Sequence, residues 1–138
     1  MGRHDHLPTD LLVGIHVLIV DDDSDARELI AVVLRYCGAL VTDVGSASEG
    51  LRLLTRIMPD VAVCDISMPE RDGYWFVRQA LGQPVEPGRS PLPVIAITAH
   101  GEMHGPDRTL PAGFQAHIRK PIDPWELCRL VASLARRG

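Results

Sequence analysis

Five polar side chains that can do chemistry stand where apolar segments of this sequence end. Asp21 and Asp22 end the first of these segments. Asp65, Thr98 and Lys120 end three later ones. A carboxylate can attack phosphorus and form an acyl phosphate, and a lysine ammonium or a bound cation can offset the charge on the phosphoryl oxygens. The residue types therefore indicate phosphoryl transfer onto one of these carboxylates, with Thr98 as a hydrogen-bond donor to the phosphoryl group.

Three carboxylates that meet at one point need protons or a cation to offset their mutual repulsion. Asp21, Asp22 and Asp65 would be in this situation if the segments that carry them lay side by side. Oxygen ligands at such density favour a hard cation, and Mg²⁺ typically binds through one or two carboxylates together with waters and a phosphate. We therefore expect Mg²⁺ at Asp21 and Asp22, beside Asp65.

Each of these residues also has an ordinary structural interpretation. Acidic residues after a strand are usually residues of a solvated loop or helix caps, and we prefer this structural interpretation for Asp23. A single Asp at a strand end is usually a cap or turn residue, and a Lys–Pro pair such as Lys120–Pro121 is usually a turn. The functional interpretation rests on the joint placement of such residues at the ends of four different strands.

Short apolar segments alternate with amphipathic ones along the chain. The expected strands cover residues 15–20, 39–43, 61–64, 94–97 and 115–119. The first of them is a continuous apolar run apart from His16, and a short run of this kind suits a strand that is buried on both faces of a parallel sheet. Alternating strands and helices favour a parallel sheet covered on both faces, with right-handed crossovers. The carboxyl ends of the strands then share the edge at which such sheets bind ligands.

Helical patterns fill the intervals between these strands. The helix after Asp23 has an apolar stripe at Ala26, Leu29, Ile30, Val33 and Leu34. Ser46 and Glu49 have capping-box spacing, and Asp123 caps a last helix with proline at its first position. Residues 73–81 form a third helix, and residues 82–93 form an exposed loop. Residues 102–111 contain two prolines, so we expect a short, displaced or mobile fourth helix there.

The composition excludes several classes of protein. The chain has 138 residues, 46% hydrophobic and 23% charged, as in one globular domain. A net charge of −4 gives no indication of a nucleic-acid surface, and no apolar run reaches the length of a membrane span. The spacing of Cys37, Cys64 and Cys128 is typical of reduced, mostly buried thiols in a cytosolic protein. We expect a cytoplasmic protein, with a leader at residues 1–13 and one domain at residues 14–138.

The sequence resembles the receiver domain of two-component response regulators over about residues 14–134. The motifs that carry the resemblance are VLIVDDD (17–23), PDVAVCDISMPERDGY (59–74), PVIAITAH (93–100) and HIRKPID (117–123). Motif, order and spacing agree, and each motif includes or follows a predicted strand. The resemblance implies a flavodoxin-like (βα)5 fold, doubly wound, with a five-stranded parallel sheet in the order 2-1-3-4-5. It also implies signalling by phosphorylation.

The resemblance assigns roles to the site residues. It implies that Asp65 is the phosphoacceptor, that Asp22 is a direct Mg²⁺ ligand and that Asp21 acts through water. It makes the backbone carbonyl of Ser67 a further metal ligand, together with Asp65. Pro69 and Gly73 match the turn that follows the phosphoacceptor in this family.

Further positions match the family's switch, with departures. Thr98 matches the switch hydroxyl, and Lys120 matches the lysine that pairs with the phosphoryl group, followed by a cis peptide bond to proline. The aromatic switch position holds His117, for which an inward-turning switch and a plain surface residue of the strand remain equal alternatives. His100 occupies the position that tunes dephosphorylation, and solvent exposure is the preferred interpretation there. The proline-containing fourth helix puts the usual dimerisation face in question, so a homodimer stays open.

Three functions compete at this point. The first is a phosphorelay receiver phosphorylated on Asp65 by a sensor histidine kinase or a histidine phosphotransfer protein, with output by protein–protein contact. The alternative is a phosphorylation-independent binding module of receiver fold. The third, a hydrolase for external phosphoesters, lacks any sign of a substrate pocket. We expect no ordinary enzyme activity beyond Mg²⁺-dependent self-phosphorylation from phosphodonors and self-dephosphorylation.

Overall fold

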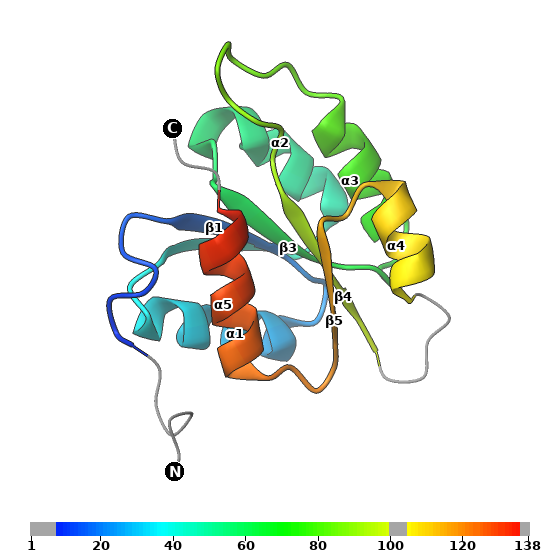
Figure 1. Cartoon of the computed structure of the whole chain (residues 1–138). Helices are drawn as coiled ribbons and strands as arrows, with labels where there is room; N and C mark the ends of the chain where they lie inside the picture. Colours follow the sequence, from blue (N-terminus) through cyan, green and yellow to red (C-terminus); the bar gives the residue numbers. More distant parts are fainter. Residues whose placement is uncertain (1–7, 100–104, 136–138) are drawn as a thin grey trace.

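A five-stranded parallel sheet forms the centre of the molecule (Figure 1). The computed structural model describes residues 8–99 and 105–135. The strand order β2-β1-β3-β4-β5 is the predicted flavodoxin-like order, and every neighbouring pair is parallel. The strands are β1 His16–Val20, β2 Leu40–Val44, β3 Val61–Asp65, β4 Val94–Thr98 and β5 Ala116–Arg119.

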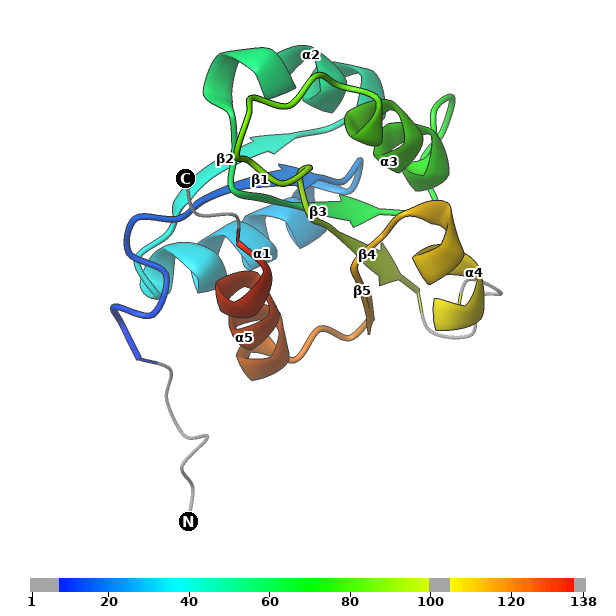
Figure 2. The same ribbon diagram turned by 45° about the horizontal axis from the view of Figure 1, so that its top comes forward.

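Five helices cover the two faces of this sheet. They are α1 Ser24–Tyr36, α2 Ala47–Ile57, α3 Gly73–Leu81, α4 Pro106–Ala112 and α5 Pro124–Leu134. Figures 1 and 2 show α1 and α5 on one face and α2 and α3 on the other, with α4 beside α3 and β5. Among the described residues, no helix is long and apolar enough to cross a membrane.

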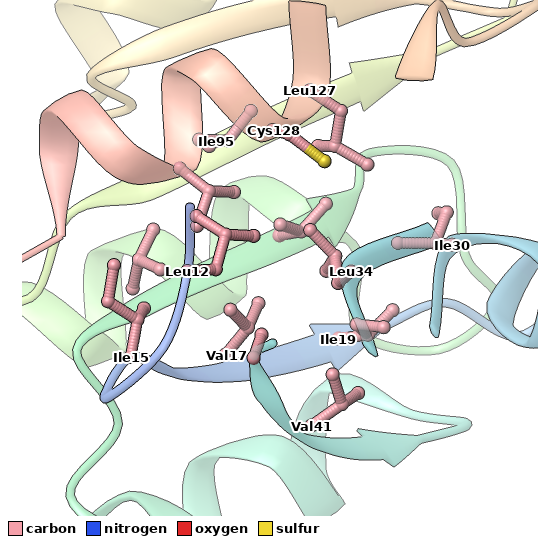
Figure 3. Close-up of a cluster of buried hydrophobic side chains, with 14 of the residues drawn as sticks. Leu12, Ile15, Val17, Ile19, Ile30, Leu34, Val41, Ile95, Leu127 and Cys128 are labelled. Atoms are coloured by element: carbon pink, nitrogen blue, oxygen red, sulfur yellow. The ribbon is translucent and has the colours of Figure 1, made fainter. Parts of the chain in front are cut away.

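The sheet separates two apolar cores. On β1, Val17 and Ile19 pack into the core under α1 and α5, part of which Figure 3 shows. Leu18 and Val20 alternate with them and pack into the core under α2 and α3. This two-sided burial is the reason why β1 is apolar throughout apart from His16.

The predicted caps are present at three helices. Asp23 accepts hydrogen bonds from the Asp25 and Ala26 amides at the start of α1, so it is a helix cap, which is one of the two structural roles expected for it. The Ser46 hydroxyl accepts from the Glu49 amide at 3.1 Å. Asp123 caps α5 through the amide of Trp125 at 2.9 Å. The apolar stripe of α1 does not face the core along its whole width, because Leu29 is 63% exposed.

The predicted weak helix is α4, which has seven residues and keeps Pro111 inside it. The part of the predicted interval at residues 102–104 lies outside the described residues. The helix starts at Pro106 because proline fits the first turn, where its missing N–H leaves no bond unmade. Its shortness therefore agrees with the expectation from the two prolines.

Two contacts that lie outside the strands of the sheet were not predicted from the sequence. Leu12 is fully buried in the core under α1 and α5, and its amide donates to the Cys37 carbonyl at 2.8 Å. The Sγ atoms of Cys37 and Cys128 lie 3.5 Å apart. All three cysteines are buried and free, in line with the expectation of reduced thiols.

Candidate functional site

The three predicted carboxylates meet at the carboxyl edge of the sheet. One oxygen from each of Asp21, Asp22 and Asp65 lies within 4.8 Å of the others. β1 and β3 are neighbours in the register Val20↔Cys64, so the next residue of each strand reaches the same point. Asp21 is 1% exposed and Asp65 is 7% exposed, whereas Asp22 is exposed. The cluster therefore has two buried carboxylates and one that faces solvent.

Asp21 has an electrostatic environment that suits a cation. Its Oδ1 accepts from the Asp23 amide at 2.9 Å. Its buried Oδ2 has no hydrogen-bond partner within the part of the chain that the structure describes. Burial raises the pKa of Asp21 above its usual value, although the Asp23 amide and Lys120 oppose that shift. A buried oxygen without a hydrogen bond, next to two other carboxylates, matches the oxygen-rich donor set that Mg²⁺ prefers.

Lys120 supplies positive charge to the same cluster. Its Nζ lies 3.8 Å from Asp21 Oδ2 and 4.0 Å from Asp65 Oδ1. The Lys120 amide donates to the Thr98 carbonyl at 2.8 Å, which holds the end of β5 against β4. The Lys120–Pro121 peptide bond is cis, as the resemblance implies. The predicted ammonium thus lies within reach of two of the carboxylates.

The loop between β3 and α3 closes over Asp65. A Cβ on Gly73 would meet the Asp65 carbonyl oxygen at 2.7 Å and Ile66 Cα at 2.8 Å, so only glycine fits there. Glu70 adopts a φ of 67°, which is uncommon for a residue with a side chain. Ser67 lies in this loop, and its role as a carbonyl ligand remains a prediction.

The Thr98 hydroxyl is hydrogen bonded to an imidazole. Thr98 Oγ1 and His117 Nε2 lie 2.8 Å apart, and Thr98 is only 2% exposed. β4 and β5 are parallel neighbours with Ala96 opposite His117. Of the two alternatives left open for His117, this contact favours an inward position. The sequence shows which residues stand on the two strands but not which side-chain rotamers they adopt.

Arg27 is a site residue that sequence analysis missed. Its Nη1 donates to the Asp21 carbonyl at 2.8 Å, and its Nε donates to Asp43 Oδ2 at 2.9 Å. The guanidinium therefore ties the loop that carries the carboxylates to the end of β2. The available signal was weak, because an arginine in the first turns of a helix is usually a surface residue. His100, the predicted tuning position, lies outside the described residues.

Comparison with known proteins agrees with this geometry. Residues 17–132 match the family model described as "Response regulator receiver domain". This chain belongs to that family. The family is a signalling module of two-component systems, so the fold and the broad function predicted from the sequence are confirmed.

Relatives of this receiver domain differ in length. It is 40% identical over 121 residues to "Uncharacterized 14.6 kDa protein in sodA1 3'region" of Leptolyngbya boryana, covering 87% of this chain and 89% of that one. It is 33% identical to the response regulator SaeR of Staphylococcus aureus, over 88% of this chain but only 51% of SaeR. A putative response regulator from Chloroflexus aurantiacus has a similar structure, with a TM-score of 0.78, 31% identity and coverage of 87% and 96%. The receiver domain therefore spans about half of some curated relatives and most of others.

Proposed function

We propose that this receiver domain takes a phosphoryl group on Asp65 from a sensor histidine kinase or a histidine phosphotransfer protein. The observation that carries the proposal is the meeting of Asp21, Asp22 and Asp65 within 4.8 Å, with Lys120 Nζ 4.0 Å from Asp65 Oδ1. A lone acidic cluster is common on protein surfaces. An acidic cluster with two buried members, a lysine and a buried threonine at one sheet edge is the arrangement that phosphoryl transfer to a carboxylate needs.

The transfer step exchanges one bond to phosphorus for another. A carboxylate oxygen of Asp65 attacks the phosphorus of a phosphohistidine, the P–N bond breaks, and its electron pair returns to the imidazole nitrogen, which carries or takes up a proton. Lys120 offsets the charge that builds up on the phosphoryl oxygens. The Thr98 hydroxyl donates a hydrogen bond to the transferred group. Its hydrogen bonding therefore changes when Asp65 is phosphorylated.

The residues for Mg²⁺ are those of the acidic cluster. Asp21, Asp22 and Asp65 would hold the ion, together with the carbonyl of Ser67. When bound, Mg²⁺ offsets the negative charge of the carboxylates and of the phosphoryl oxygens. The buried Asp21 Oδ2, which lacks a hydrogen bond within the described residues, supports this assignment.

The surface of α1 is suited to a phosphodonor protein. Leu29, Val32 and Tyr36 are more than half exposed and lie three and four residues apart, on one face of the helix. α1 begins two residues after Asp22, so a partner that presents a phosphohistidine to Asp65 lies next to this face. An exposed apolar stripe beside the site fits a helix of the donor. We infer that the chain acts in the cytoplasm together with this partner. Its output is by protein–protein contact.

Intact-mass measurement tests the phosphorylation. The full chain is incubated with acetyl phosphate and Mg²⁺, and we expect the mass of one phosphoryl group to be added. Addition of EDTA should prevent the gain, and Asp65→Asn should remove it. An equal gain in Asp65→Asn, or none in the wild type, would show that Asp65 is not the acceptor. The expected self-dephosphorylation is followed as the decay of the added mass once the donor is removed.

A second candidate is a binding module that works without phosphate. The seven-residue α4 favours it, because a short helix offers little of the surface through which a phosphorylation signal leaves the fold. Partner binding by Asp65→Asn and by the wild type, with and without acetyl phosphate, separates the two candidates. Affinity that is the same in all four samples would favour the binding module.

A further inference from the structure

The hydrogen bond between Thr98 and His117 raises a question about where its proton lies. Within residues 8–99 and 105–135, His117 Nε2 is the hydrogen-bond partner of Thr98 Oγ1, at 2.8 Å. Thr98 is 2% exposed, so its hydroxyl is shielded from solvent. Either group can donate, because a hydroxyl has one proton and two lone pairs and a neutral imidazole has one protonated and one unprotonated nitrogen. The distance alone does not say which of them donates.

Burial decides the direction of this bond in the unphosphorylated protein. If Nε2 carried the ring proton, it would donate to Thr98, and the hydroxyl proton of Thr98 would have no acceptor among the described residues. A buried donor without an acceptor is unfavourable. If Nε2 is unprotonated, Thr98 donates to it and both groups are satisfied. Among the described residues, the arrangement that satisfies both groups is therefore the one in which the ring proton lies on Nδ1.

Phosphorylation changes the requirement on His117. This step rests on the proposed function, in which Thr98 donates its single proton to the phosphoryl group on Asp65. The side of Thr98 Oγ1 that faces His117 then presents only lone pairs. An unprotonated Nε2 would place a second lone pair against it, and two acceptors at hydrogen-bond distance repel each other. A proton on Nε2, taken from solvent or accompanied by loss of the Nδ1 proton, restores the bond.

We propose that His117 is a positioning residue whose Nε2 changes from hydrogen-bond acceptor to donor when Asp65 is phosphorylated. The imidazole keeps Thr98 held in both states, because one ring nitrogen can take either role. A phenyl ring at the same place can take neither. His117 lies on β5 and is partly exposed, so the proton change at the buried threonine reaches the surface of the sheet edge.

Nitrogen NMR of the full chain tests the proposal directly. The protein carries ¹⁵N in its histidines, and the Nε2 signal of His117 is assigned by its loss in His117→Gln. We expect an unprotonated, pyridine-like Nε2 before acetyl phosphate and Mg²⁺ are added and a protonated Nε2 afterwards. Intact mass of the same sample gives the phosphorylated fraction. Phosphorylation with no change at Nε2 overturns this inference alone, whereas an absent mass gain overturns the proposed function as well. A protonated Nε2 in the resting sample overturns the first half in either case.

Two substitutions separate hydrogen bonding from packing. The amide of His117→Gln offers both a donor and an acceptor, whereas the ring of His117→Phe fills space without offering either. At a fixed acetyl phosphate concentration, we expect the steady-state ratio of phosphorylated to unphosphorylated protein to be lower in His117→Phe by roughly three- to tenfold, the scale of one hydrogen bond. His117→Gln should restore most of it. Thermal unfolding confirms that both variants are folded, and a His117→Phe variant equal to the wild type contradicts the role of Nε2.

Discussion

Asp21 is the most deeply buried carboxylate of the acidic cluster. It is 1% exposed, and its Oδ2 has no hydrogen bond within the described part of the chain. The nearest cationic group is Lys120, at 3.8 Å, which is longer than a good charge-assisted hydrogen bond. An ionised carboxylate in this place destabilises the fold unless a metal ion is bound. Stability and metal binding should therefore respond in opposite directions when its charge is removed.

Asp21→Asn should stabilise the metal-free protein at neutral pH by about 1 kcal/mol. Burial raises the pKa of Asp21, so the folded state holds this proton more tightly than the unfolded state. The stability is therefore highest below the pKa of the unfolded chain and falls as the pH rises through the pKa of the folded chain. At neutral pH the charge opposes folding, and the amide removes it. Urea unfolding in EDTA measures the change.

Asp22→Asn is the matched control for this prediction. Asp22 belongs to the same cluster but is exposed, so its amide variant should leave the metal-free stability nearly unchanged. Both variants should lose most of the stabilisation that added Mg²⁺ gives the wild type. A metal-free Asp21→Asn protein that is less stable than the wild type contradicts this account of the buried charge.

Gly73 offers a second residue-level test, because its missing side chain allows the loop to approach Asp65. Gly73→Ala should lower stability by about 1–3 kcal/mol and slow labelling of Asp65, since the new methyl group would displace the Asp65 carbonyl or Ile66. Gly82→Ala is the control, because its Cβ would meet only ordinary contacts, at 3.5 and 3.7 Å. Urea unfolding and the rate of mass gain with acetyl phosphate measure both effects. Equal behaviour of the two variants would exclude the steric explanation.

The meeting of the site residues was predictable, but their contacts were only partly so. Asp21, Asp65, Thr98 and Lys120 end parallel strands, and parallel strands bring their ends to one edge whatever the side chains do. The bond between Thr98 and His117 depends on the rotamers of both side chains, which a strand pattern does not determine. The position of an element is therefore easier to predict than the direction in which its side chains point.

At the scale of elements, α1 shows how periodicity can mislead. Its sequence holds apolar residues on two faces, and sequence analysis placed Leu29 on the same apolar stripe as Ile30 and Leu34. In the structure, Ile30, Ala31 and Leu34 are buried, whereas Leu29, Val32 and Tyr36 are exposed. Hydrophobicity alone does not separate a core stripe from a docking stripe, because both repeat every three to four residues.

Val32→Lys should therefore slow phosphotransfer from a protein donor without affecting labelling by acetyl phosphate. We expect roughly a tenfold loss of rate, because a charge in an apolar contact removes the binding that brings the phosphohistidine to Asp65. The donor is the histidine kinase or phosphotransfer protein that labels the wild type fastest in a profiling panel. Val85→Lys is the control, since Val85 is 40% exposed in the loop between α3 and β4. An equal slowing in both variants would argue against docking on α1.

The start of β1 has a pH-sensitive contact away from the acidic cluster. His16 Nε2 lies 2.8 Å from the Thr42 hydroxyl on β2, and the His16 amide donates to Asp60 Oδ2 at 2.8 Å. Burial lowers the pKa of His16, and the nearby Asp60 carboxylate opposes that shift. The unfolded chain therefore binds more protons than the folded chain just below the usual histidine pKa, and stability rises with pH in that window.

His16→Gln should reduce this pH dependence. Glutamine keeps a polar contact with Thr42 but does not titrate, so the wild type should gain more unfolding free energy than the variant from about pH 5 to about pH 7.5. Urea midpoints at several pH values give the comparison, and the difference between the two proteins removes the contribution of the other histidines. Parallel curves would mean that His16 titrates alike in the folded and unfolded states.

At the scale of the whole molecule, the domain's packing begins before its first strand. The predicted boundary at residue 14 followed the start of the resemblance to the receiver domain. Leu12 nevertheless packs in the core under α1 and α5, as Figure 3 shows, and its amide is bonded to the carbonyl of Cys37. Leu12 stands in an apolar run of only three residues, 11–13, which is too short to show a periodicity. Its burial therefore depends on tertiary contacts that sequence analysis could not detect.

Leu12→Ala should destabilise the domain by about 2–4 kcal/mol, although Leu12 lies outside every strand and helix. The side chain is fully buried, so its loss removes apolar contacts and leaves a cavity next to the end of α1. Val13→Ala is the control one residue away, because Val13 is 63% exposed and its truncation should cost less than about 0.5 kcal/mol. Urea unfolding measures both changes. A similarly small effect in both variants would place the boundary of the folded unit at residue 14, whereas a large difference places Leu12 inside it.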